Sequence, residues 1–500
     1  MRRRLIFLAF ALLFIAGCNK PESGTSPTSG GLGGGPHAQV QAENQAFLNQ
    51  KNFDPWVLAS LNPSNGLAVY LSNGKKGITL GPTGQPLALY QAGHYTPTGV
   101  LAQSSPPALA SLPAKSSPPG GTYIQTLNLQ TGTLSMRSAQ GVTDLCLASD
   151  GYWPKFWKTS DIEIDGDPEA QQVTHANMFY LASSTYAGSD HSIPPMGLSS
   201  NVYDGHIFWD AEIWMFPALI AQHPDLAKSI VDYRFKLLPQ AMKNAALHGF
   251  KGAEYPWESA ADGKEEAPAE FAKERHITAD VAYAAWQYYL WTGDKDYLKK
   301  EGWPILQATA DYWLSRAKKG PDGAYHIDDV LPPDETAEDV SDDAWTNAIV
   351  QYNLRAAYQA AILTNNAPVG SILPPPPYSQ WKTVADKIAL PFDKTQGIYL
   401  EYAGVGPGRL MAKQADTQML IYPLNVPMSD AVAGKTLDYC LQHTINVGPA
   451  MTSSINAIVA ARLGRAQQSL DLFRDSYRPF ERGPWDAFSE KRTTDNVYFC

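Results

Sequence analysis

The sequence predicts a mainly α-helical protein, an (α/α) toroid that follows a small β domain, and three observations lead to this fold class. From about residue 167 onwards, long helical segments follow one another along the chain. Some, such as VAYAAWQYYLW, are apolar on nearly every side, whereas others, such as LKKEGWPILQATADYWLSRAKK, are amphipathic. Their alternation is typical of helical hairpins with an inner and an outer member. Before residue 165, short alternating segments between turn residues predict strands instead.

The first 17 residues resemble a bacterial lipoprotein signal peptide. Three arginines at positions 2–4 precede an apolar run over residues 5–15, which is too short to span a bilayer as a helix. Ile15-Ala16-Gly17-Cys18 resembles a lipobox, in which cleavage makes the cysteine the lipidated N-terminus; an ordinary signal peptide with a chance cysteine is the alternative. We therefore expect an exported bacterial lipoprotein, periplasmic or on the cell surface, that contacts the membrane only through acyl chains at Cys18.

The β domain is expected over residues 45–165, after a flexible tether over residues 18–44 that is rich in Gly, Ser, Thr and Pro. The segment LAVYLSNGKKGITL alternates apolar and polar residues around the turn residues Asn73-Gly74, which predicts a hairpin. The segment TYIQTLNLQTGTLSMRS has a similar pattern. The stretch between them, PTGVLAQSSPPALASLPAKSSPPGG, is expected to be a loop.

The helical domain is expected over residues 166–500. Asp167 and Pro168 predict a helix start, with Asp as the N-cap and Pro at the first helical position. The further segments with helical periodicity are AEIWMFPALIAQHP, LAKSIVDYRFKLLPQAMKNAALHG, HITADVAYAAWQYYLWTG, DYLKKEGWPILQATADYWLSRAKKG, DDAWTNAIVQYNLRAAYQAAILTN, SDAVAGKTLDYCLQHT, SINAIVAARLG and AQQSLDLFRDSYRPF.

Composition limits the function classes. The formal net charge of −10 argues against nucleic-acid partners and against anionic lipid patches. The 13 Trp and 25 Tyr suit a protein that stacks aromatic rings on sugars, although most aromatic residues serve the core. Beyond Cys18, the three remaining cysteines, Cys146, Cys440 and Cys500, do not define a disulfide framework. The spacing of Cys and His residues matches no metal site, and we expect no metal or organic cofactor.

Five loops concentrate acids and aromatic residues, and long loops in a compact domain usually carry function. Cleavage of a glycosidic bond needs a carboxylic acid that protonates the leaving oxygen, and an inverting enzyme needs a second carboxylate that activates water. A tryptophan beside a carboxyl group both binds the sugar face and raises the pKa of the acid. Capping of helices and pairing with surface cations are the alternative for each acid. The loops are Asp204–Asp210, Gly252–Ser259, Leu331–Thr336, Lys413–Asp416 and Pro484–Glu490.

Four motifs, FWDAEIWMFP, GAEYPWESA, PPDE and KQAD, occur in an order and at intervals that resemble glycoside hydrolase family 65. The family comprises α-glucoside phosphorylases and hydrolases, among them kojibiose and maltose phosphorylases and the animal glucosidase acting on glucosyl-galactosyl-hydroxylysine. The resemblance runs from about residue 161 to residue 500. It implies an (α/α)6 barrel after an N-terminal β-sandwich, which agrees with the order of elements predicted above.

The resemblance also implies roles for individual residues. Glu335 of the Pro-Pro-Asp-Glu loop matches the general acid. Trp209 with Asp210, and Lys413 with Gln414, match the pairs that hold the glucosyl residue before the scissile bond. Trp257 and Glu258 lie in a motif that lines the pocket, although Glu258 fits a structural hydrogen-bond acceptor equally well. His276 also lies in a family-like stretch and is expected to be a core or pocket-wall histidine.

Whether water or phosphate is the nucleophile depends on two segments. Phe488-Ser489-Glu490 resembles Trp-Thr-Glu of the hydrolytic members, which makes Glu490 the candidate general base; a surface acid beside Lys491 and Arg492 is the alternative. The Thr-Ser-Ser run at residues 452–454 could cradle phosphate, but the preceding Gly-Pro-Ala-Met-Thr is closer to the hydrolytic animal enzyme. We therefore expect inverting hydrolysis of small α-linked glucosides, kojibiose-like or glucosyl-galactose-like, with an α-glucoside phosphorylase as the alternative.

The sequence departs from the family at two places. Only about 30 residues separate the predicted strand segment near Met136 from the helix start at Asp167, so the β-sandwich is expected to be shortened. The chain ends at Cys500, where the family continues with a closing barrel helix and a small β domain, so the barrel is expected to be incomplete at its end. An open barrel would expose apolar surface. A catalytically impaired, glycan-binding surface lipoprotein is therefore a further alternative.

Overall fold

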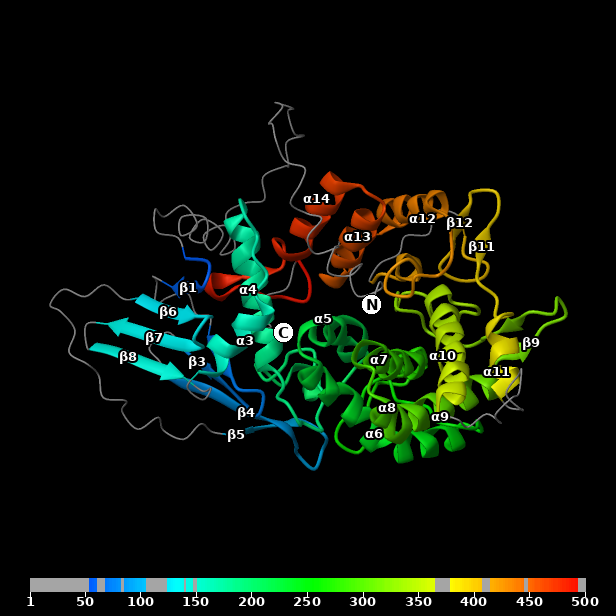
Figure 1. The fold of residues 1–500 in the computed structure, drawn as a ribbon, viewed down its shortest axis with the longest axis horizontal. Helices are drawn as coiled ribbons and strands as arrows, with labels where there is room; N and C mark the ends of the chain where they lie inside the picture. The colour runs from blue at the N-terminus through cyan, green and yellow to red at the C-terminus, as the bar shows by residue number, and fades with distance from the viewer. Residues whose placement is uncertain are drawn as a thin grey trace.

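The computed structural model describes residues 54–60, 68–81, 85–104, 124–138, 141–146, 151–364, 378–406, 414–444 and 448–492. The predicted signal peptide, the tether and Cys18 lie outside these residues. Strands β1 to β8 occupy one end of the molecule and most helices the other, with α3 and α4 between them (Figure 1). This arrangement agrees with the predicted order of a β domain followed by a helical domain.

The β domain contains two antiparallel four-stranded sheets. The hairpin predicted around Asn73-Gly74 is present, with Ser72 opposite Gly77 and Gly74 at φ 76°. The second hairpin pairs Asn128 with Thr133. The orders are β1-β6-β7-β8 and β2-β3-β4-β5, with β1 Val57–Ser60, β2 Val69–Ser72, β3 Lys76–Leu80, β4 Pro86–Tyr95, β5 Leu101–Ser104, β6 Ile124–Asn128, β7 Thr133–Ser138 and β8 Gly141–Cys146.

One prediction for this domain was wrong. The stretch that begins at Pro97 was expected to be a loop, but Leu101–Ser104 form strand β5 at the end of a sheet. An edge strand needs a pairing partner on one side only, here β4, so its sequence carries a weak strand pattern. The Pro- and Ser-rich residues that follow it lie outside the described residues.

The helical domain consists of hairpins, as predicted. Asp167 caps α4 by accepting a hydrogen bond from the amide of Ala170 at 3.1 Å. The helices are α3 Tyr152–Ser160, α4 Pro168–Ser183, α5 Phe216–Gln222, α6 Pro224–Leu247, α7 Ile277–Thr292, α8 Lys295–Tyr297, α9 Trp303–Arg316, α10 Ala344–Leu363, α11 Tyr378–Ala385, α12 Asp430–His443, α13 Met451–Arg462 and α14 Ala466–Tyr477. Helices α3 and α11 were not predicted, because they are short, nine and eight residues, and follow glycine or proline residues that break helices.

Burial separates inner from outer helices. Every residue of α7 from Ile277 to Trp286 is buried, as expected for an inner helix that is apolar on all sides. In α14, by contrast, only Ser469, Ser476 and Tyr477 are buried, as expected for an outer helix. The segment predicted to be helical through Gly320 ends at Arg316, and Lys318–Lys319 form the short strand β9. The fold of the described residues is thus the predicted helical barrel preceded by a β domain.

A fully buried ion pair joins helix α6 to the segment that follows Asp210. Arg234 of α6 donates from Nε and Nη2 to the two carboxylate oxygens of Glu212, at 2.7 and 3.0 Å. Glu212 belongs to the π-helical turn η2, Ala211–Met215, which leads into α5. Nη2 also donates to the carbonyl of Phe208 at 3.1 Å, and Nη1 to Ser259 Oγ at 3.4 Å. One side chain therefore fixes three segments of the chain relative to one another.

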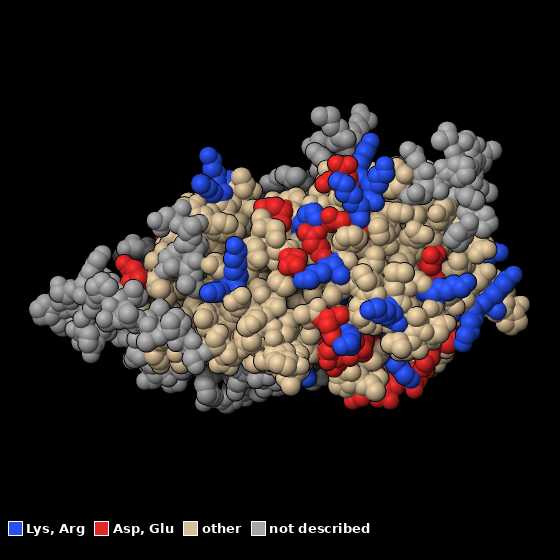
Figure 2. All heavy atoms as spheres, turned by 90° about the horizontal axis from the view of Figure 1, so that it is seen from below, with Lys and Arg blue, Asp and Glu red and all other residues tan. Residues whose placement is uncertain are grey.

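The surface carries charges of both signs. On the face shown in Figure 2, Lys and Arg side chains are interspersed with Asp and Glu. Among the helices of the described residues, none combines the length and the apolar content that crossing a bilayer requires.

Loss of one partner of the buried pair should be costly. Glu212→Gln leaves the Arg234 guanidinium buried without a counter-charge, and we expect the free energy of unfolding to fall by about 3–5 kcal/mol. Urea denaturation followed by circular dichroism measures this change. The matched control is Asp190→Asn, which breaks the exposed pair with Lys236; we expect that change to cost no more than about 1 kcal/mol. Equal losses in both variants would contradict the structural role of the buried pair.

Candidate functional site

The loop that carries Trp209 and Asp210 begins with a strained turn. Tyr203 and Asp204 both have a φ of 54°, in the left-handed region that residues other than glycine rarely adopt. Gly205 follows at φ 69°, and a Cβ at this position would lie 2.3 Å from Cβ of Leu101, so only glycine fits. Strained residues of this kind persist where the surrounding structure holds them, and they concentrate at functional sites.

The Trp209 loop and the Trp257 loop lie side by side. Ile207 and Ser259 form an isolated antiparallel bridge that joins them. The rings of Trp209 and Trp257 are 6.1 Å apart, and both are buried. Asp210 follows Trp209 directly and is partly exposed as a residue, although its carboxyl group lies deep enough for burial to raise its pKa.

Glu265 fixes the backbone of the Trp257 loop. One of its carboxylate oxygens accepts from the amide of Trp257 at 2.8 Å, and the other accepts from the amide of Glu258 at 3.1 Å. The Glu258 side chain in turn accepts from His206 Nδ1 at 2.8 Å. Glu258 is therefore oriented through both its backbone and its side chain.

Glu335 lies at the end of a closed loop. The bridge between Val330 and Val340 closes the loop at its base. Asp334, which is fully buried, accepts from the hydroxyl of Thr336 at 2.8 Å. Glu335 itself is half-buried, and its Oε1 accepts from Nε2 of Gln414 at 3.4 Å. The structure therefore brings together the predicted acid and one member of the predicted Lys-Gln pair.

Several acidic residues lie close to Asp416, which follows Gln414 in the chain. Asp416, two residues further on, is fully buried. Burial raises the pKa of Asp416 well above its ordinary value, and the nearby negative charges of Asp343 and Glu401 add to this shift. Burial and like charges both favour the protonated form of a carboxyl group. Asp416 therefore adds to the group of buried acids near Gln414, and its protonated form is favoured more than that of an exposed aspartate.

Glu490 enters the site from the other end of the chain. The short strands β13, Glu481–Arg482, and β14, Ala487–Phe488, form a hairpin just before it. Arg482 donates to the carbonyls of Lys491 and Arg492, at 3.3 and 3.1 Å, and so fixes the backbone that follows Glu490. The Tyr203 hydroxyl donates to Oε2 of Glu490 at 2.8 Å. Glu490 is thus tied to the loop that carries Asp210, although the two are far apart in sequence.

Three predicted site residues, Asp210, Glu335 and Glu490, lie near enough to affect one another electrostatically. Burial is the main cause that raises the pKa of Asp210 to about 7; its own backbone amide opposes the shift, and the charges of Glu212, Glu490 and Glu335 add to it. Charges act on one another over distances on the order of 10 Å in physiological salt. Asp210, Glu335 and Glu490 therefore lie close enough for each carboxylate to affect the others.

His276 lies in the core beneath the two tryptophans, as predicted. Its ring is 4.7 Å from that of Trp209 and 5.4 Å from that of Trp257. Nδ1 faces Asp280 at 2.6 Å and Nε2 faces Glu274 at 3.3 Å. Burial acts to lower the pKa of His276, but the two carboxylates outweigh it and raise the pKa to about 9. A positive charge beneath the site thus offsets part of its negative charge.

Two predicted residues, Lys413 and Cys18, lie outside the described residues. The structure also adds two residues that the sequence did not predict to act at the site, Tyr203 and His206. The tyrosine directly precedes the Asp204–Asp210 loop, but its contact with Glu490 joins distant parts of the chain and leaves no local sequence pattern. Within the described residues, no group of three or more His, Cys, Asp or Glu has an arrangement that could hold a metal ion.

Residues 175–406 match the model of the glycosyl hydrolase family 65 central catalytic domain. A kojibiose hydrolase from Mucilaginibacter mallensis is 41% identical over 365 residues, which cover 72% of this chain and 52% of that protein. A protein-glucosylgalactosylhydroxylysine glucosidase from Gallus gallus is 35% identical over 338 residues, which cover 65% and 47% of the two chains. A kojibiose phosphorylase from Caldanaerobacter subterraneus subsp. tengcongensis is 35% identical over 302 residues, or 55% and 39%.

Among solved structures, one assigned as a kojibiose phosphorylase from the human microbiome superposes with a TM-score of 0.66 and covers 84% of each chain. At 14% identity, this likeness establishes the fold, an (α/α)6 barrel with an N-terminal β domain. The chain spans about half the length of the first two curated relatives, 52% and 50%.

The convergence of the three carboxylates can be tested through the titration of Asp210. In Glu490→Gln and in Glu335→Gln, one negative charge is removed, so the ionised form of Asp210 is favoured and its pKa should fall below the value of about 7. Carbon-13 NMR of aspartate-labelled protein follows this titration. Glu338→Gln, which changes an exposed acid of the same loop as Glu335, is the matched control and should leave the titration unchanged. An Asp210 pKa that changes in neither variant would contradict the prediction, because Glu335 and Glu490 would then lie too far from Asp210 to affect it.

Proposed function

The chain contains the central catalytic domain of glycosyl hydrolase family 65, and from this premise we propose that it hydrolyses α-glucosidic bonds in small α-linked glucosides with inversion. Kojibiose-like and glucosyl-galactose-like disaccharides are the proposed substrates. The relatives with hydrolase names, which include a kojibiose hydrolase and a glucosylgalactosylhydroxylysine glucosidase, support this choice. The observation that carries the proposal is the position of the two glutamates: Gln414 donates to Glu335 at 3.4 Å, Tyr203 beside the Asp210 loop donates to Glu490 at 2.8 Å, and both glutamates affect Asp210 electrostatically.

In the proposed mechanism, the two glutamates act in a single displacement. Glu335 donates its proton to the glycosidic oxygen as the bond to the anomeric carbon breaks. Glu490 takes a proton from the water that attacks the anomeric carbon from the opposite face. The products are glucose and the free acceptor sugar, and the net transfer leaves Glu335 ionised and Glu490 protonated until solvent restores them.

The remaining residues would hold the glucosyl ring. Asp210 and Gln414 offer a carboxyl and an amide group to its hydroxyls, and Lys413 is proposed to join them. Trp209 contributes to the apolar floor beside them. Tyr203 would keep Glu490 oriented toward the water, because its hydroxyl donates to Oε2 at 2.8 Å.

The surroundings of the Thr-Ser-Ser run favour water over phosphate as the nucleophile. Thr452, Ser453, Asp475 and Arg492 line a cavity of about 260 Å³. The Ser453 hydroxyl donates to Asp475 Oδ2 at 2.8 Å, and Arg492 Nη2 lies 2.5 Å from the same oxygen. Asp475 therefore already pairs with the Arg492 cation and the Ser453 hydroxyl, the two groups that an incoming phosphate would need. The two competing proposals are an α-glucoside phosphorylase and a catalytically impaired glycan-binding protein.

The proposal for location rests on the sequence. The lipobox-like run that ends at Cys18 supports export and lipid anchoring of the protein, with the catalytic domain held off the membrane by the tether over residues 18–44. Hydrolysis suits that location, because the sugar phosphate made by a phosphorylase is useful only inside a cell.

The activity can be tested by glucose release. We expect the protein to release glucose from kojibiose at a rate that inorganic phosphate does not change, with no sugar phosphate formed. Glu335→Gln and Glu490→Gln should each lower kcat by at least about 100-fold, because general acid–base catalysis typically supplies 10²–10⁴-fold. Coupled glucose assays and chromatography of the products measure both quantities.

Glu338→Gln serves as the control for this experiment, since it removes an exposed acid from the same loop. Phosphate-dependent formation of glucose 1-phosphate would favour the phosphorylase. Calorimetric binding of kojibiose without any release of glucose would favour the glycan-binding protein.

A further inference from the structure

The β domain holds the turn that carries Tyr203. The Tyr95 hydroxyl, at the end of strand β4, donates to the carbonyl oxygen of Gly205 at 2.7 Å. Burial is the main cause that raises the pKa of Tyr95, and Tyr233 adds to the shift, so the hydroxyl keeps its hydrogen and stays a donor. Leu101 of β5 contacts the same glycine, because a Cβ added to Gly205 would lie 2.3 Å from Cβ of Leu101. Both strands at this edge of the β domain therefore hold the turn.

The backbone on both sides of Tyr95 is fixed. The register of β4 against β5 shifts just before Tyr95, which marks a bulge. Gly93 lies in this bulge at φ 66°, and a Cβ there would lie 2.1 Å from the ring of His191. Directly after Tyr95, the amide of Thr96 donates to the carbonyl of Val100 at 2.8 Å and closes the turn into β5. The bend and the turn together direct the Tyr95 side chain toward the helical domain.

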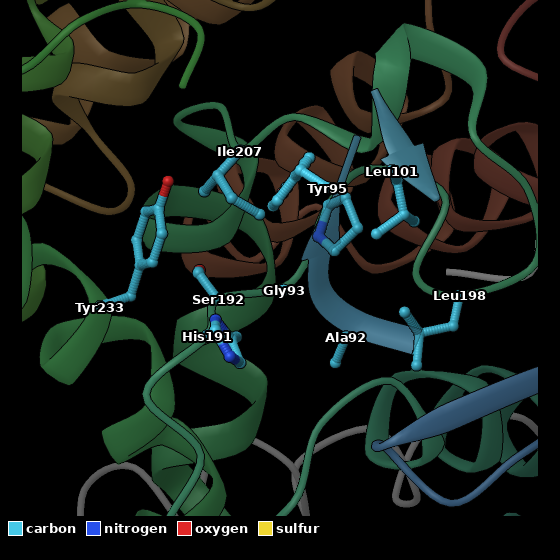
Figure 3. Close-up of a pocket in the computed structure, with 10 residues that line it drawn as sticks. Ala92, Gly93, Tyr95, Leu101, His191, Ser192, Leu198, Ile207 and Tyr233 are labelled. Atoms are coloured by element: carbon cyan, nitrogen blue, oxygen red, sulfur yellow. The ribbon is translucent and has the colours of Figure 1, made fainter. Parts of the chain in front are cut away.

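The two domains are closely packed beside the Tyr95 side chain. Tyr95 and Leu101 line, together with Ile207 and Tyr233 of the helical domain, a cavity of only about 10 Å³ (Figure 3). A space of that size holds at most about one water molecule. The Tyr95 hydroxyl therefore has little room to move away from the Gly205 carbonyl.

The turn needs support from outside because its backbone is strained. Tyr203, Asp204 and Gly205 follow one another in the left-handed region, at φ 54°, 54° and 69°. Residues other than glycine persist in this region only where the surrounding structure holds them. Within the turn, the amide of His206 donates to the carbonyl of Tyr203 at 2.9 Å. The bond from Tyr95 adds a contact from the β domain at the last of the three strained residues.

Tyr203 reaches from this turn to the proposed general base. Its hydroxyl donates to Oε2 of Glu490 at 2.8 Å, and hydrogen bonds to a carboxylate are stronger than those between neutral groups. Its ring packs against that of Phe208 at 5.7 Å in an edge-on contact. Tyr203 is nevertheless 43% exposed. The position of its hydroxyl therefore depends strongly on the conformation of the turn.

We propose that Tyr95 is a positioning residue for the reaction: it holds the Gly205 carbonyl, keeps the turn in its left-handed form and so directs the Tyr203 hydroxyl to Glu490. This inference rests on the proposed function, in which Glu490 takes a proton from the attacking water. The β domain thus contributes to catalysis without touching the substrate. Loss of the contact lets the turn relax, and Glu490 loses part of its orientation, whereas the residues that hold the glucosyl ring are unchanged.

A double-mutant cycle separates this role from a merely structural one. In Tyr95→Phe, we expect kcat for glucose release from kojibiose to fall roughly 3- to 10-fold with KM unchanged, as for the loss of one neutral hydrogen bond. Tyr203→Phe should lower kcat roughly 10- to 100-fold, because a hydrogen bond to a charged group is lost. In the Tyr203→Phe background, Tyr95→Phe should lower kcat no further, because the hydroxyl that it positions is absent.

Tyr90→Phe is the matched control, because Tyr90 lies on the same strand and its hydroxyl lies 3.5 Å from Oδ1 of Asn201, outside the strained turn; it should leave kcat unchanged. Leu101→Val weakens the second contact with Gly205 and is the variant to use if Tyr95→Phe fails to fold. Its effect on kcat should likewise disappear in the Tyr203→Phe background.

Equal fold-losses of kcat from Tyr95→Phe in the wild-type and Tyr203→Phe backgrounds would show that Tyr95 does not act through Tyr203. That result, or a rise in KM with kcat unchanged, would overturn this inference and leave the proposed function intact. A wild-type protein that releases no glucose from kojibiose would overturn the proposed function and this inference together.

Discussion

The buried pair between Arg234 and Glu212 is the interaction on which the rest of the site depends. Two charges removed from water are tolerated only where they are paired closely and their remaining hydrogen-bonding groups are satisfied. The guanidinium meets this condition through the carboxylate, the Phe208 carbonyl and Ser259. These contacts force the Trp209 loop and the Trp257 loop onto one helix, α6. Together with the bridge between Ile207 and Ser259, they hold the two aromatic–acid pairs side by side.

The second constraint is the accumulation of negative charge. Asp210 is affected by the charges of Glu335 and Glu490, and Asp416 by that of Asp343. Three features of the protein reduce the repulsion among these carboxylates. Burial raises the pKa of carboxyl groups such as Asp416 and so favours their protonated form. His276 supplies a buried positive charge, and hydroxyl or amide donors such as Tyr203 and Gln414 face the remaining carboxylates. A site of this kind holds protons close to neutral pH, as acid–base chemistry on a neutral sugar requires.

Much of the fold could be predicted because its determinants are local. The Asp167 cap, the turn at Asn73-Gly74 and the uniformly apolar text of α7 each specify their element within a few residues. The loops of the site could be recognised by composition and motif, but their convergence depends on contacts between distant residues. The bond from Tyr203 to Glu490 joins residues 287 positions apart, and the link from His206 to Gly99 joins two domains. Neither leaves a periodic pattern, and the left-handed conformation of Tyr203 runs against its residue type.

The central claim is that two glutamates from distant parts of the chain act on opposite faces of one glucosyl residue. Proton NMR of the first glucose released from kojibiose tests this claim most directly, because the two anomers have separate signals and interconvert slowly. Attack by water on the face opposite the leaving group produces β-glucose first, with α-glucose following by mutarotation. Initial release of α-glucose would contradict the proposed roles of Glu335 and Glu490.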